Sequence, residues 1–221
     1  MLELITTELL RFDVFRLASQ QRNVDFLRAQ GFDDESVDEM LDLLKARGIS
    51  DKPEDLCDGP FRPKPRLQKV GHRTRFSDGT FPVFYSALEP ETADAEVRHW
   101  FRNIAGKPTK PRTAYYSRFS CDFEGSIKDL RPMHAEWPNL THDSDYRFCN
   151  SLGSEAVASR LDGLLTPSAR NPNGTNVPVF QRRAVSNPLV HALVAVTLDP
   201  PSGVAELTEW SIASPRLLVR Q

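Results

Sequence analysis

The sequence predicts an α+β protein whose sheet-forming main domain follows an N-terminal helical extension. Two observations predict the sheet: short apolar runs recur through the second half of the chain, and turn signals such as Asn171-Pro172-Asn173-Gly174 separate them. A third, the dense apolar residues near the N-terminus, predicts helices over residues 6–48. A chain of 221 residues can bury one good core, or one core and a small helical annex.

The pattern divides the chain into three regions: a helical extension (1–50), a proline-rich linker (51–68) and a main domain (69–221). A separate helix in the extension is capped by Asp33 or Asp34 and ends at Gly48. Its acidic composition disfavours contact with nucleic-acid phosphates, so we expect it to pack on the main domain or on a partner. Residues 51–68 contain four prolines and no periodicity, which predicts a linker or an extended arm.

The main domain begins with a strand and a helix that carry polar residues of chemical interest. Residues 81–87 are mostly apolar and predict a short strand, with Pro82 placing it at an edge or at a strand's beginning. Proline and acids at residues 89–91 predict a helix start, and the helix runs to about Ile104. Glu96 falls on the edge of its apolar stripe, which comprises Ala93, Val97, Trp100 and Ile104.

Strands and one further helix are expected in the remainder of the chain. A helix is predicted over 145–161, and the segment starting at Leu164-Leu165 delivers Ser168. Residues 131–144 predict a polar loop. The expected strands are Tyr115–Phe123, Ile127–Leu130, Val177–Val185, Val190–Leu198 (a central strand), Val204–Ile212 and Leu217–Val219.

Composition excludes several functional classes. A net charge of −2 provides no general attraction to nucleic acid or membrane surfaces. The most apolar stretch, Leu189 to Leu198, is too short to span a bilayer, and the N-terminus lacks the features of a secretory signal. Three cysteines without C-x-x-C spacing favour reduced thiols in a cytoplasmic protein. His134 and His142 alone are weak evidence for a metal, and we expect none.

Three residues at fixed intervals connect the sequence to a known family. Arg75 precedes Tyr85 by ten residues, and Tyr85 precedes Glu96 by eleven, within a segment that begins Arg-Phe-Ser-Asp-Gly-Thr. Together with Pro167-Ser168-Ala169, this order resembles the RES domain family over roughly residues 62–190. The sequence departs from the family at Phe76, where a tryptophan is usual, and in its long N-terminal extension.

The resemblance implies a mixed, mainly antiparallel sheet similar to that of ADP-ribosyltransferase toxins. It also implies an enzyme that consumes NAD+ and is restrained by a cognate antitoxin, expected to be an Xre-type DNA-binding protein. On this interpretation Arg75, Tyr85, Glu96 and Ser168 form the catalytic set. For the oligomeric state, a homo-oligomer is one option.

The chemistry of these residue types fits NAD+. A guanidinium grips a diphosphate, a tyrosine ring stacks on a cationic ring, and a carboxylate stabilises an oxocarbenium-like sugar. We therefore expect Arg75 to bind the phosphates, Tyr85 to position the nicotinamide, and Glu96 to support glycosidic cleavage. Ser168 would orient Glu96 or the substrate, and Arg73, Arg170 and Asn176 are expected as further contacts.

Three alternatives remain open at this level. Spacing alone is also compatible with an ordinary boundary glutamate, a core tyrosine and a solvated turn arginine. An enzyme of the same class could transfer ADP-ribose to a protein or to phosphate in place of water. A non-catalytic interaction module would cleave no NAD+ and would tolerate substitution of the four residues.

Overall fold

The computed structural model describes residues 1–19, 33, 35–36, 39, 53–62, 73–105, 109–199 and 203–211. In these ranges the prediction of an α+β fold is confirmed. The helices are α3 (Pro53–Asp58), α4 (Pro90–Ala105) and α5 (Arg147–Ala158). The strands are β1 (Thr7–Ser19), β2 (Phe84–Ala87), β3 (Arg112–Asp129), β4 (Gly163–Pro167), β5 (Thr175–Val179), β6 (Val185–Leu198) and β7 (Ala205–Ser211).

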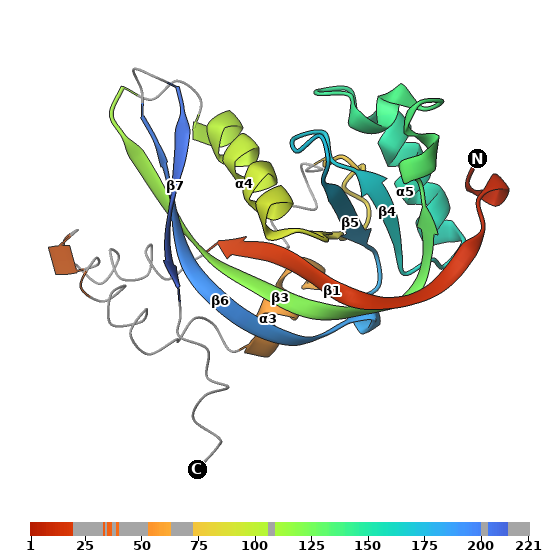
Figure 1. The fold of residues 1–221 in the computed structure, drawn as a ribbon, viewed down its shortest axis with the longest axis horizontal. Coiled ribbons are helices and arrows are strands. Elements are labelled where there is room, and N and C mark those ends of the chain that lie inside the picture. Colours follow the sequence, from red (N-terminus) through yellow and green to blue (C-terminus); the bar gives the residue numbers. More distant parts are fainter. Residues whose placement is uncertain are drawn as a thin grey trace, which may run out of the picture.

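The strands of the described segments form one mixed, mainly antiparallel sheet in the order β1-β2-β5-β4-β3-β6-β7. The β3–β4 pair is parallel and the other recorded pairs are antiparallel. Because β1 pairs with β3 as well as with β2, five strands close into a ring, and β6 and β7 extend the sheet outward from β3 (Figure 1). Helices α4 and α3 lie on opposite sides of the long strands (Figure 1).

The N-terminal segment is part of this sheet, and the prediction of helix over Thr7–Ser19 is wrong. The segment is strand β1 and pairs with β3 along its whole length, with Phe12 opposite Phe123 and their rings stacked at 4.9 Å. Its apolar residues are dense because they serve two cores: Val14 packs inside the ring, whereas Leu17 packs in the cluster beneath α4. A segment that is apolar on both faces lacks the alternation that marks a half-buried strand.

The linker prediction is also wrong for part of 51–68. Residues Pro53–Asp58 form helix α3, and Leu56 and Cys57 are buried in the core. Proline suits the first position of a helix, where its missing N–H has no intrahelical partner. In the extension, Asp33 Oδ1 accepts a hydrogen bond from Ser36 N at 2.9 Å, as predicted for a helix cap. Most of residues 20–52 lies outside the described part, as does the strand expected at Leu217–Val219.

Helix α4 begins at Pro90 as predicted, but its buried face is rotated from the expected one. Ala93 and Val97 pack against the sheet, and Phe101 continues that face with 8 % exposure. Trp100, expected in the apolar stripe, is 58 % exposed. Phe101 lies one turn beyond Val97, and its ring takes the contact that the sequence pattern assigned to Trp100.

Several boundaries differ from those predicted. The two strands expected between residues 115 and 130 are one continuous strand, β3, and β5 ends at Val179 rather than at Val185. Strand β6 covers the predicted 190–198 and has a neighbour on each side. The loop over 131–144 contains two short 3-10 turns, Arg131–His134 and Pro138–Thr141. A third core cluster, around α5 and β4, buries Phe76 next to the turn that carries Arg75.

Candidate active site

Glu96 is held at one carboxylate oxygen by two buried donors. Ser168 Oγ donates to Glu96 Oε1 at 3.0 Å, and Asn176 Nδ2 donates to the same oxygen at 2.7 Å. Glu96 itself is half-buried. Two donors on one oxygen fix the plane of the carboxylate. The arrangement leaves Oε2 without a hydrogen-bond partner among the described residues.

Ser168 links Glu96 to the turn that follows β4. Its hydroxyl accepts hydrogen bonds from the backbone N–H groups of Arg170 and Asn171, both at 3.1 Å, while it donates to Glu96. The one proton and both lone pairs of the oxygen are therefore in use. A hydroxyl in this state orients a neighbour and does not act as a nucleophile activated by a base.

Asn176 lies where three strands meet. It is opposite Ala87 of β2 and Thr166 of β4, and β2 leads directly into α4. The strand pairing therefore sets the distance between Asn176 on β5 and Glu96 on α4. Asn176 is 7 % exposed, so its end of the contact with Glu96 is shielded from water.

The turn after Ser168 is fastened to the start of α4. Asn171 Nδ2 donates to Thr92 Oγ1 at 2.9 Å, and that hydroxyl donates to Glu89 Oε2 at 2.7 Å. The same carboxylate oxygen accepts from Thr175 N at 2.9 Å. A Cβ on Gly174 would lie 2.0 Å from Thr92 Oγ1, so only glycine permits this approach. These contacts keep Ser168 and α4 in one arrangement.

Arg75 is buried, not a solvated turn residue, with 8 % exposure. Its Nη1 donates to the backbone oxygens of Leu140 and His142, at 3.2 and 2.9 Å. Its guanidinium carbon lies 4.7 Å from the centre of the Tyr146 ring, a cation–π distance. Arg75 thus anchors the loop before α5, and its contact with a substrate stays a prediction.

Tyr85 and helix α5 hold the turn that carries Arg75. The Tyr85 hydroxyl donates to Thr74 Oγ1 at 2.6 Å and accepts from Phe76 N at 2.8 Å, and burial raises the pKa of Tyr85 to about 12. Asn150 Nδ2 donates to the backbone oxygen of Thr74 at 2.6 Å. A Cβ on Gly153 would lie 2.0 Å from the Phe76 oxygen, so α5 touches this turn directly. The predicted role of the Tyr85 ring in positioning nicotinamide stays a prediction.

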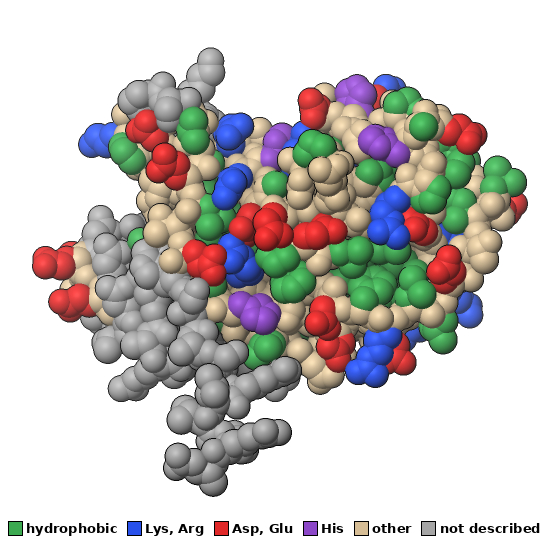
Figure 2. Space-filling view, viewed as in Figure 1, with side chains coloured by type: hydrophobic (Ala, Val, Ile, Leu, Met, Phe, Trp, Pro, Cys, Tyr) green, Lys and Arg blue, Asp and Glu red, His purple; other side chains and the backbone are tan. Residues whose placement is uncertain are grey.

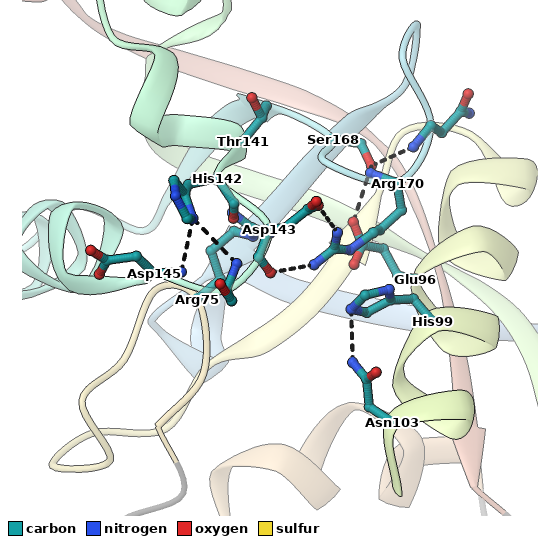
Figure 3. A network of polar contacts seen from close by, with 12 residues as sticks. Arg75, Glu96, His99, Asn103, Thr141, His142, Asp143, Asp145, Ser168 and Arg170 are labelled. Carbon is teal, nitrogen blue, oxygen red and sulfur yellow. Dashed lines mark hydrogen bonds and ion pairs between the residues drawn. The ribbon is translucent and has the colours of Figure 1, made fainter. Parts of the chain in front are cut away.

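Arg170 lies between Glu96 and the loop before α5 that Arg75 anchors (Figure 3). Its two terminal nitrogens bind Asp143, with Nη1 2.5 Å from Oδ1 and Nη2 2.8 Å from the backbone oxygen. Arg170 and Asn176, both predicted as further contacts, therefore lie in the network around Glu96. Arg73, the third, is exposed, and its charge interacts with Asp78.

Sequence reasoning missed His99 and Asp143. His99 follows Glu96 by one helical turn, and its ring lies beside the Glu96 carboxylate (Figure 3). Burial, assisted by the positive charge of Arg170, lowers the pKa of His99, and Asn103 Nδ2 lies 2.8 Å from Nε2. A spacing of three residues on a predicted helix was a usable signal for His99. Asp143, in a polar loop, carried none.

The comparisons with known proteins agree with the residues that suggested a family. A sequence model of the RES domain matches residues 45–199, well over half of the chain. The chain belongs to the RES domain family. This RES match begins before the predicted residue 62 and therefore includes α3. A comparison with curated proteins finds no match.

The fold of this RES protein is similar to a chain in the crystal structure of the M. tuberculosis MbcT-MbcA toxin-antitoxin complex. The TM-score is 0.51 and the match covers 89 % of each chain. At 15 % sequence identity the similarity concerns the fold. It supports the predicted fold class for the RES domain and its N-terminal strand together.

A buried ion pair braces the helix that presents Glu96 in this RES domain. Asp94, two residues earlier on α4, binds Arg118 of β3 through two hydrogen bonds of 3.1 and 2.5 Å. Arg118 also donates to Glu209 of β7 at 2.6 Å. The side chains of Asp94 and Arg118 are 12 % and 10 % exposed, so water screens the pair weakly. This contact ties α4 to two strands.

The described part of the RES chain contains no cluster of three or more His, Cys, Asp or Glu side chains arranged to hold a metal. Cys57, Cys121 and Cys149 are free thiols and are buried. No helix in the described ranges has the length and apolarity needed to cross a membrane. On the face drawn in Figure 2, acidic and basic side chains are intermixed and no large area carries one sign of charge.

Proposed function

We propose that this RES protein cleaves the nicotinamide N-glycosidic bond of NAD+ and thereby acts as a toxin that depletes NAD+. The observation that carries the proposal is the state of Glu96. Two buried donors hold Oε1, so Oε2 has a fixed direction and remains available. A preorganised carboxylate stabilises positive charge that develops in a transition state without having to reorient.

In the proposed reaction, the bond between the ribose C1′ and the nicotinamide nitrogen breaks. Its electron pair goes to the nicotinamide ring, which leaves as a neutral molecule, and the ribose acquires oxocarbenium character. Glu96 stabilises that positive charge. Water or phosphate then bonds to C1′ through an oxygen and loses a proton, which Glu96 can accept.

The remaining residues are proposed to bind NAD+. Arg75 and Arg170 supply positive charge beside Glu96 for the diphosphate, and Tyr85 supplies an aromatic face for the nicotinamide end. Asn176 positions Glu96 and lies within reach of the same ligand. Because Arg73 is exposed, it would contact only the part of the substrate that faces solvent. The buried Arg75 and Arg170 side chains support this assignment, because buried guanidinium groups interact strongly with anions.

We also propose that a cognate antitoxin binds and neutralises this protein, and that it is an Xre-type DNA-binding protein. Support comes from membership of the RES family and from the fold shared with a chain of a toxin-antitoxin complex. An enzyme that consumes NAD+ in the cytoplasm harms its own cell unless it is restrained. Co-expression with the product of a neighbouring reading frame should therefore restore growth.

Product analysis tests the reaction. The purified protein is incubated with NAD+, with and without inorganic phosphate, and the products are identified by mass spectrometry. Free nicotinamide with ADP-ribose indicates hydrolysis, and nicotinamide with phosphorylated ADP-ribose indicates phosphorolysis. Nicotinamide release only when a protein acceptor is present would replace the proposal with ADP-ribosyl transfer. No nicotinamide under any condition would contradict catalysis and favour an interaction module.

A further inference from the structure

One loop, residues 140–143, accepts hydrogen bonds from two arginines of the candidate site, Arg75 and Arg170. Arg75 binds the backbone oxygens of Leu140 and His142, and Arg170 binds the carboxylate and backbone oxygen of Asp143. Figure 3 shows the loop passing between the two guanidinium groups. Oxygen atoms of the protein therefore lie where the proposed function needs the oxygens of a diphosphate.

The two arginines differ in what holds them. The partners of Arg75 are backbone oxygens, and releasing them would require the loop itself to move. The carboxylate partner of Arg170 belongs to a side chain that is 83 % exposed, while the Arg170 side chain is 9 % exposed. A rotation of the Asp143 side chain would expose the buried guanidinium to another anion without refolding the loop.

Arg170 also has a donor that Asp143 does not use. Its Nε is buried and has no hydrogen-bond partner among the described residues. Asp143 approaches the far end of the guanidinium, at Nη1 and Nη2. A buried N–H without a partner is costly, and guanidinium groups commonly bind phosphate oxygens through two parallel bonds. A phosphate that contacts Nε and one terminal nitrogen would satisfy this donor.

We propose that Arg170 receives a phosphate of the substrate's diphosphate and that the Asp143 carboxylate competes for this guanidinium until the substrate displaces it. The inference rests on the proposed function and deepens it. It assigns the displaceable anion contact to Arg170, whereas Arg75 would reach the diphosphate only after the loop has moved away from its guanidinium. The ligand class is a diphosphate ester such as a dinucleotide, since one phosphate on Arg170 places the next sugar toward Glu96.

Neutralising Asp143 tests the competition. In Asp143→Asn the competing charge is gone, so the KM for NAD+ should fall up to about fivefold, the range expected for losing one partly exposed ion pair. Any change in kcat should be smaller. The matched control is Asp145→Asn, which removes the same charge two residues further along the chain, from a carboxylate paired with the exposed Arg147. An unchanged or higher KM in Asp143→Asn, or an equal fall in Asp145→Asn, would overturn the inference.

A binding measurement separates this inference from the proposed reaction. Inorganic pyrophosphate should raise the Tm of the wild type, raise that of Asp143→Asn further, and leave that of Arg170→Gln unchanged. Arg170→Lys, which keeps the charge but loses the planar fork, should respond weakly, and circular dichroism verifies that both variants fold. This pattern without NAD+ cleavage would support the anion site and reject the reaction. NAD+ cleavage with equal pyrophosphate shifts in the wild type and Arg170→Gln would reject the anion site alone.

Discussion

Ser168 donates its hydroxyl proton to Glu96 Oε1 across 3.0 Å, although 72 residues separate them in the chain. The same hydroxyl accepts two backbone N–H groups of the turn that follows it. The position of the carboxylate on α4 is therefore coupled to the conformation of the turn after β4. Substitutions in either element should affect both catalysis and local stability.

Replacing Ser168 with alanine should lower activity and stability together. The variant loses one donor to Glu96 and leaves the N–H groups of Arg170 and Asn171 without their acceptor, at a cost of about 1–3 kcal/mol in unfolding free energy. Denaturant unfolding and nicotinamide release measure the two effects. Ser151→Ala, which removes an exposed hydroxyl bonded only to a carbonyl of its own helix, should change neither.

Asn176→Asp should be more harmful than its small change in volume suggests. It places a second carboxylate against Glu96 at the position of a 2.7 Å hydrogen bond, and two like charges at this distance repel in a buried site. We expect activity to fall at least about tenfold, as for loss of a positioned transition-state group. Asn187→Asp makes an equivalent carboxylate pair with Asp122, at an exposed irregularity in the pairing of strands β3 and β6, and should retain activity. Equal losses in the two variants would contradict the assignment of Asn176.

The raised pKa of Tyr85 predicts that the folded protein loses stability at alkaline pH. Burial raises the pKa of Tyr85, and that of Tyr116, from 10 to about 12. The folded protein thus retains protons that the unfolded chain releases, so this contribution is complete below pH 10 and is lost as pH rises through 12. In Tyr85→Phe the decline between pH 10 and pH 12 should be shallower than in the wild type. Urea unfolding at several alkaline pH values measures it, and an unchanged slope would contradict the burial of the phenol.

The ion pair between Asp94 of α4 and Arg118 provides a fourth prediction. Asp94→Asn breaks a buried ion pair and leaves Arg118 with Glu209 alone, which should cost about 3 kcal/mol of unfolding free energy and reduce activity through Glu96. The control is Asp122→Asn, which breaks a pair with the exposed Arg11 and should cost about 1 kcal/mol or less. A similar cost in the two variants would show that α4 does not depend on this contact.

Local signals predicted much of the fold. Proline and acids at the start of α4, the apolar run over residues 81–87, and the turn at 171–174 each depend on residues close in the chain. The structure has the helix, the turn and, over Phe84–Ala87, the strand. Strand β1 was missed because its two faces contact two cores, which removes the periodicity that distinguishes a strand. Helix α3 was missed because its prolines resemble those of a linker.

The candidate site was predictable to the extent that a family pattern marks it. Glu96, Ser168 and Asn176 were named from the sequence, and the structure brings them into direct contact. Asp143 and Arg118 act through partners 24 or more residues away, and a single sequence carries no signal for such pairs. The engagement of Arg75 with a loop 65 residues away was hidden for the same reason.

Nicotinamide release by the wild type and by Glu96→Gln is the most direct test of the account. Glutamine keeps the size and one oxygen of the side chain but removes the charge that stabilises the ribosyl cation. We expect the wild type to release nicotinamide from NAD+ and Glu96→Gln to lose at least about a hundredfold in kcat. Glu91→Gln, an exposed change on the same helix, should match the wild type. A Glu96→Gln variant that releases nicotinamide at the wild-type rate would contradict the central role given to this carboxylate.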